Sequence, residues 1–208
     1  MVGGFSHLGR KISEFKDSLW NDLEDDEIRV AEAECYDAEM PTTKEIRTYS
    51  CRLAKIIDAQ KPEAILAHSM GGLTLIDALG ILKNSGKPWK GKIVFIETPF
   101  NGAPRWKLKY TGFPVNAPSV RDMFWDSDFM MNLDFTVLNG CEVLCILGSF
   151  SNKYFGLIGW LAKPVMDPNK KFNAPMVITC KKIEHKALLK HSRAGIAVKN
   201  FFYGVFPF

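Results

Sequence analysis

The sequence predicts a single α/β domain, residues 1–208, with a mostly parallel sheet and helices on both of its faces. Patterns typical of helices and of strands alternate along the chain, and a parallel sheet with crossover helices requires that alternation. A length of 208 residues suits one hydrophobic core. The apolar fraction of 47% and the charged fraction of 24% are ordinary for a folded domain and exclude the disordered and fibrous classes.

The first part of the chain alternates between helix and strand. Residues 8–24 place apolar side chains every three or four positions, which predicts a helix, and residues 28–36 predict a short strand. A second helical pattern covers residues 43–59 and ends before Pro62, because proline cannot continue a helix. The apolar run 64–67 then predicts a buried strand.

The alternation continues in the rest of the chain. Residues 71–82 predict a long apolar helix, closed by the turn-forming residues 84–86. Three further apolar runs have the length and composition of strands: residues 92–96, 143–147 and 176–180. Residues 194–202 predict the last helix.

Charge, cysteines and hydropathy limit the function classes. The net charge of +4 comes from 27 basic and 23 acidic residues, which is too mild and too mixed for a nucleic-acid partner. Most of the five cysteines sit in apolar runs and none forms a C-x-x-C pair, so we expect reduced core residues: Cys35, Cys51, Cys141, Cys145 and Cys180. No leader and no apolar run of roughly 18 residues stands out, which predicts a soluble, cytoplasmic protein. No H-E-x-x-H, G-K-[ST] or clustered Cys/His pattern occurs, so we expect neither a metal nor another cofactor.

Residues 65–73 predict a strand, a tight turn and a helix, with Ser69 at the turn. Small residues two before and two after this serine, Ala67 and Gly71, suit the strained G-x-S-x-G turn that presents a nucleophile. At the start of the helix, the N–H of Met70 and the positive end of the helix dipole would stabilise a developing oxyanion. A serine before two glycines also suits an ordinary turn. The flanking strand and helix favour the nucleophile.

The motif H-S-M-G-G, residues 68–72, resembles the elbow of lipases and esterases of the α/β-hydrolase superfamily. Residues 94–102 are similar to the T-P-H-x-G motif of bacterial lipase-like proteins, with Phe100 in place of the histidine. Residues 118–123 and 127–133 are similar to the segment that follows in those lipases. The resemblance implies a reduced α/β-hydrolase fold and a serine hydrolase.

The resemblance also implies a histidine on a loop after the last strand. His185 lies in a segment similar to the G-H-x-x-L-L run of lipases, and His191 is the other histidine late enough in the chain. We expect His185 to remove the proton of Ser69. Residues 3–6 resemble the glycine-rich oxyanion loop, whose donor would be the N–H of Phe5. Few residues precede this loop, so we expect either a trimmed fold or an incomplete N-terminus.

The acid that orients the histidine has several candidates. Asp167 is the first choice, because it lies between the last two strands, where related lipases carry an Asp-Gly-Val-Val segment. Glu97 is the alternative, because a few lipases place the acid at the end of the strand after the nucleophile. Asn152 stands where other hydrolases have their aspartate and would be a poor substitute. A missing acid is the remaining alternative.

Residues 104–140 are a candidate cap or lid, because their aromatic side chains suit an acyl pocket. A second core layer, or a surface for a partner or a peripheral lipid contact, would have the same composition. The hypothesis is an ester hydrolase that acts on a small-molecule or lipid ester through an acyl-serine intermediate. The alternatives are an amidase or acyltransferase with the same residues, and a hydrolase-like binding protein that has lost its acid.

Overall fold

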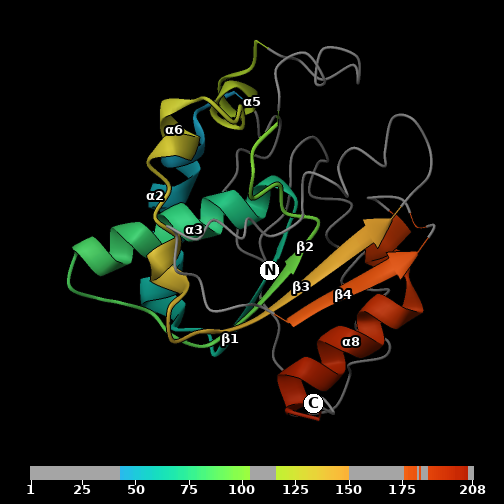
Figure 1. Ribbon diagram of the computed structural model, residues 1–208. Coiled ribbons are helices and arrows are strands. Elements are labelled where there is room, and N and C mark those ends of the chain that lie inside the picture. Colours follow the sequence, from blue (N-terminus) through green and yellow to red (C-terminus); the bar gives the residue numbers. More distant parts are fainter. Residues whose placement is uncertain (1–42, 104–115, 150–175, 182, 184–186, 206–208) are drawn as a thin grey trace.

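The computed structural model describes residues 43–103, 116–149, 176–181, 183 and 187–205. Within these ranges, four parallel strands form one sheet whose spatial order follows the chain (Figure 1). The strands are β1 (Ala64–His68), β2 (Lys92–Ile96), β3 (Glu142–Ser149) and β4 (Met176–Lys181). The four apolar runs from residue 64 onward are therefore confirmed as strands. The helix expected over 8–24 and the strand expected over 28–36 lie outside the described residues.

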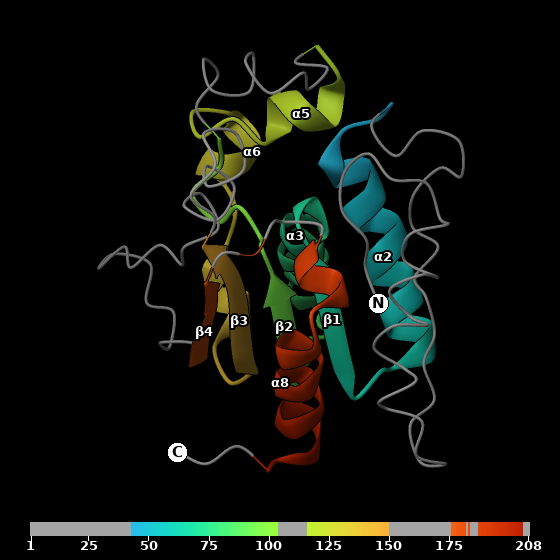
Figure 2. The ribbon, with the colours of Figure 1, turned by 90° about the vertical axis from the view of Figure 1, so that its right-hand side faces the viewer.

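Helices cover both faces of this sheet, as predicted. On one face α2 (Ile46–Gln60) packs against α3 (Met70–Asn84), and on the opposite face lies α8 (Ser192–Tyr203) (Figures 1 and 2). Each face has its own cluster of buried apolar side chains, which we call the α3-side core and the α8-side core. Ile65 and Ala67 of β1 belong to the α3-side core, whereas Leu66 between them belongs to the α8-side core. Because successive side chains of a strand point to opposite faces, a strand buried on both faces has a continuous apolar sequence.

The helix ends follow from local sequence and from distant contacts. α2 ends at Gln60, and Lys61 adopts a left-handed conformation with φ 44° directly before Pro62. The first N–H of α2, from Ile46, donates to Asp122 Oδ2 at 2.7 Å. Asp122 is 76 residues away in sequence, so this end of the helix is stabilised by a tertiary contact and not by a neighbouring capping residue.

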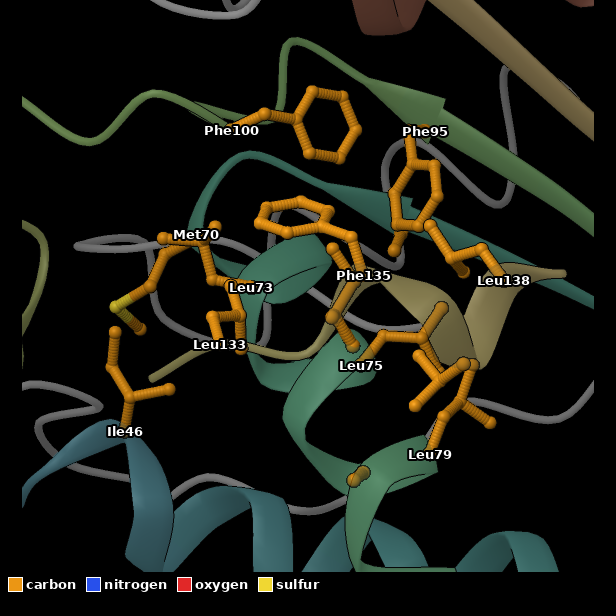
Figure 3. Packing of buried hydrophobic residues seen from close by; sticks show 14 of the residues in the cluster. Ile46, Met70, Leu73, Leu75, Leu79, Phe95, Phe100, Leu133, Phe135 and Leu138 are labelled. Carbon is orange, nitrogen blue, oxygen red and sulfur yellow. The ribbon is translucent and has the colours of Figure 1, made fainter. Parts of the chain in front are cut away.

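The segment after β2 folds into short helices that join the α3-side core. These are α5 (Pro118–Asp122), α6 (Asp128–Met131) and the 3-10 helix η1 (Phe135–Leu138). Phe100 packs edge-on against Phe95, with ring centroids 5.0 Å apart, and against Phe135 at 6.2 Å (Figure 3). An apolar ring at position 100 is thus part of the core, which accounts for its presence where the lipase motif has histidine. The cap expected over 104–140 stays a prediction, since residues 104–115 are not described.

The cysteine prediction needs one correction. Cys145 and Cys180 are buried and Cys141 is half-buried, but Cys51 is exposed. It lies on the solvent side of α2, because the buried positions of that helix are at helical spacing on its other side. These four are free thiols, and Cys35 lies outside the described residues. None of the helices in the described part of the chain is long and apolar enough to cross a membrane.

Candidate active site

Ser69 occupies a sharp turn between β1 and α3. Its backbone angles, φ 54° and ψ −129°, lie in a region that residues other than glycine rarely adopt. The Ser69 N–H donates to the carbonyl of Ile96 at 2.9 Å, and the Ser69 carbonyl accepts the N–H of Gly72 at 3.0 Å. The turn is therefore fixed to the neighbouring strand on one side and to the first turn of α3 on the other. Such a conformation costs on the order of 1–3 kcal/mol, which the surrounding contacts must offset.

The turn depends on small residues, and the structure gives the reason at two positions. Ala67 is fully buried two residues before the serine. A Cβ added to Gly72 would lie 2.7 Å from Thr98 Cβ and closer still to the Thr98 hydroxyl. Thr98, which follows β2, is fully buried, so it has no room to move away. The contact between Gly72 and Thr98 therefore locks the turn after β1 to the turn after β2.

Met70, the first residue of α3, supplies a backbone donor next to Ser69. The first N–H groups of a helix have no carbonyl partner within the helix, and they carry the positive end of the helix dipole. The Met70 side chain is fully buried in the α3-side core, which holds this end of the helix rigidly (Figure 3). A carbonyl oxygen bound beside Ser69 would therefore meet a fixed N–H donor and a favourable potential.

Glu97 occupies the corresponding place at the end of β2. Its φ is 51°, and Lys61, Ser69 and Glu97 are the non-glycine residues with positive φ in the part of the chain that the structure describes. The residue is 1% exposed. Its N–H donates to the carbonyl of Ile146 at 3.0 Å, and its Oε1 accepts the N–H of Gly148 in β3. A buried carboxyl group therefore stands one strand away from Ser69, on the same edge of the sheet.

Burial controls the protonation of this carboxyl group. Desolvation raises the pKa of Glu97 from 4.5 to about 7, while the hydrogen bond from Gly148 opposes that rise. Cys180 in β4 is the register partner of Gly148. Burial raises the pKa of the Cys180 thiol; the nearby Arg193 in α8 lowers it, and Glu97 raises it. A buried carboxyl group that titrates near neutral pH is typical of functional sites.

The structure brings together three of the predicted site residues, namely Ser69, Met70 and Glu97. The other candidates lie outside the described residues: Phe5, Asn152, Asp167 and His185. His191, the second candidate base, is the N-cap residue of α8. Gly148 and Thr98 carry contacts that sequence reasoning did not single out. The sequence signal for Thr98 is its place in the T-P-x-x-G run, and Gly148 is marked as the glycine that follows a buried apolar run.

Ile183, two residues after the end of β4, lies next to Gly148. A Cβ added to Gly148 would lie 2.7 Å from the carbonyl oxygen of Ile183 and 3.0 Å from Glu97 Oε1. The Ile183 carbonyl and the Glu97 carboxyl group therefore flank the same point in space. Ile183 is two residues before His185 in sequence. Among the described residues, no group of three or more His, Cys, Asp and Glu side chains could hold a metal ion.

The comparisons with known proteins are structural, since neither the family models nor the curated proteins match the sequence. The product of gene lin2722 from Listeria innocua is similar over 100% of this chain and 93% of that one, with a TM-score of 0.61 and 17% identity. The mature lipase BlEst2 from Bacillus licheniformis is similar over 99% of this chain and 88% of its own, with a TM-score of 0.59 and 14% identity. MenH from S. aureus is similar over 98% of this chain and 92% of its own, with a TM-score of 0.60 and 11% identity.

Proposed function

We propose, from the α/β-hydrolase fold that this chain adopts, that the protein is a carboxylic ester hydrolase with Ser69 as its nucleophile. Ser69 Oγ attacks the ester carbonyl carbon while His185 takes the hydroxyl proton. The N–H groups of Met70 and Phe5 hold the oxyanion of the tetrahedral intermediate. The intermediate collapses, the alcohol leaves with the proton from His185, and an acyl-serine remains. Water, deprotonated by His185, then attacks this acyl group and releases the acid and the free serine.

The observation that carries this proposal is the pair of left-handed turns at the ends of two neighbouring strands. Ser69 follows β1 and Glu97 follows β2, and each has a positive φ that costs free energy. Strain of this kind persists where the surrounding structure fixes it, and it clusters at active sites. A serine nucleophile and a carboxyl group on one sheet edge are two of the three parts of a catalytic triad.

Two carboxyl groups compete for the role of the acid, and the described contacts favour Glu97 over Asp167. Glu97 is buried, accepts a backbone hydrogen bond and lies beside the carbonyl of Ile183, two residues before the proposed base. Asp167 remains the alternative, since it lies outside the described residues. The acid must be ionised to orient the imidazole and stabilise its cation. With a pKa of about 7 for Glu97, hydrolysis should increase as the pH rises through neutrality.

The aromatic composition of residues 104–140 supports an apolar acyl group in the substrate, either a small-molecule ester or a lipid ester. Two exposed apolar side chains of this stretch are described: Trp125 is 63% exposed and Met131 is 69% exposed. Amide hydrolysis and acyl transfer would use the same residues, since only the leaving group and the acceptor differ.

Hydrolysis of p-nitrophenyl butyrate and p-nitrophenyl octanoate tests the proposal. Ser69→Ala and His185→Ala should each lower kcat by at least about 10³-fold, because removing one member of a triad disables the others. Ser85→Ala is the matched control, since Ser85 is exposed at the far end of the same helix. Comparison of Glu97→Gln with Asp167→Asn identifies the acid as the more damaged variant. Turnover by Ser69→Ala at the wild-type rate would overturn the proposal.

A further inference from the structure

We infer that Gly148 is a positioning residue for the proposed reaction: its N–H fixes the Glu97 carboxyl group, and its missing side chain leaves room for the Ile183 carbonyl and that carboxyl group. The inference rests on the proposed function and on Glu97 being the acid. It assigns to a glycine of β3 a role that neither the nucleophile motif nor the fold requires.

The hydrogen bond from Gly148 to Glu97 takes the place of a bond of the β2–β3 ladder. In a parallel ladder, a residue that donates its N–H to one strand residue accepts, through its carbonyl, the N–H two residues further along that strand. Glu97 donates to Ile146, so a regular ladder would place the Gly148 N–H on the Glu97 carbonyl. In this structure the N–H of Gly148 donates to Glu97 Oε1 instead. The left-handed backbone of Glu97 ends the strand there, and the side chain takes the place of the next ladder bond.

Position 148 has no room for a side chain. A methyl group at position 148 would lie 2.7 Å from the Ile183 carbonyl oxygen and 3.0 Å from Glu97 Oε1. The first distance is to backbone, so an alanine would displace either β3 or the chain at Ile183. It would also press on the Glu97 carboxyl group, whose Oε1 lies at the second distance. Only glycine provides the donor and leaves this space empty.

Several titratable and charged groups lie on the elements around the Glu97 carboxyl group. β4 contributes Cys180 opposite Gly148, and α8 contributes Arg193, which acts on the Cys180 thiol. β1 ends in His68, whose register partner is Ile96, the residue before Glu97. The N–H of Gly148 acts on Glu97 itself, and it lowers the pKa of that group against the effect of burial. An alanine keeps the N–H of residue 148, but a displaced β3 would move that N–H away from Glu97 Oε1 and should therefore leave Glu97 protonated to a higher pH.

Gly148→Ala tests the inference, with Gly80→Ala as the control. Gly80 lies in α3, and a Cβ there would meet nothing within 4 Å. On p-nitrophenyl butyrate, Gly148→Ala should lower kcat by about 10-fold or more with KM changed less than about 2-fold, the pattern of a lost transition-state interaction. The acid limb of its pH profile of kcat should move to higher pH. Gly80→Ala should have the kcat, KM and pH profile of the wild type. In a Glu97→Gln background, Gly148→Ala should have no further effect, because both changes act through one group.

A measurement on the unaltered glycine covers the case in which Gly148→Ala does not fold. The amide resonance of Gly148 in the wild type should titrate with a midpoint of about 7, and in Glu97→Gln it should not titrate. An active wild type whose Gly148 amide does not titrate, or a folded and fully active Gly148→Ala, would overturn the inference and leave the proposed function standing. A wild type inert toward the esters would overturn the proposed function, and the inference with it.

Discussion

Replacing Glu97 by glutamine should make the protein more stable at alkaline pH while it impairs the proposed reaction. Glu97 is 1% exposed, and the pKa of its carboxyl group rises from 4.5 to about 7 on folding, mainly by desolvation. Because the folded pKa is raised, this group stabilises the fold fully below pH 4.5, and that contribution is lost as the pH rises to about 7. At about 1.36 kcal/mol for each pH unit, the loss is on the order of 3 kcal/mol.

Glutamine keeps the shape of the side chain and an oxygen that can accept the Gly148 N–H, but it carries no charge at any pH. The two proteins should therefore have similar free energies of unfolding at pH 4. At pH 8.5 the variant should be more stable by about 3 kcal/mol, because it does not bury a carboxylate. Urea denaturation followed by tryptophan fluorescence from pH 4 to pH 9 gives this difference directly.

Glu63→Gln is the matched control for this experiment, because it removes a carboxylate from an exposed side chain close to the start of β1. It should change the pH dependence of the free energy of unfolding by only a few tenths of a kcal/mol. A parallel loss of stability by Glu97→Gln and the wild type between pH 4 and 8.5, or a variant that is the less stable protein at pH 8.5, would show that burial does not raise the pKa of Glu97 as described. A confirmed difference would mean that the fold carries an unfavourable buried charge at the site, a cost that active sites commonly impose on stability.

Two further predictions concern the packing that supports the site. Gly72→Ala should lower the free energy of unfolding by about 1–3 kcal/mol, because the new methyl group overlaps Thr98. Gly80→Ala in the same helix should raise the free energy of unfolding by about 0.5–1 kcal/mol, because its methyl group meets no atom within 4 Å. Equal effects of the two variants in thermal denaturation would contradict the contact between Gly72 and Thr98. Lys92→Met should destabilise the protein by about 1–2 kcal/mol, because Lys92 Nζ donates to two carbonyls in the last turn of α8 at 3.1 and 3.0 Å. Unchanged amide hydrogen exchange in that turn would contradict this prediction.

Much of the fold follows from local sequence, because both faces of the sheet are buried. The strands have continuous apolar sequences for that reason, and the run 92–96 matches β2 residue for residue. The ends of other elements depend on tertiary contacts. β3 continues to Ser149 through Gly148, which has no intrinsic preference for a strand, since both residues pair with β4. The start of α2 likewise depends on Asp122, which no local pattern could identify.

In the candidate site, too, some residues can be identified from local sequence and others only from the tertiary structure. Ser69 is recognisable because its proposed role needs only a strand, a turn and a helix that are adjacent in sequence. Glu97 could be proposed only as an alternative acid, because its position relative to Ser69 depends on which strands are neighbours. The contribution of Gly148 depends on the register between β2 and β3, whose residues are about 50 positions apart. A role that arises from register has no signal in a single sequence.

The most direct test of the central claim is the site at which a fluorophosphonate reacts with the protein. If Ser69 is the nucleophile, the wild type should take up one equivalent of label, located on Ser69 by mass spectrometry of tryptic peptides. Ser69→Ala should take up no label, and Glu97→Gln should be labelled more slowly than the wild type. Absence of label from the wild type, or equal labelling of Ser69→Ala, would show that Ser69 is not an activated nucleophile.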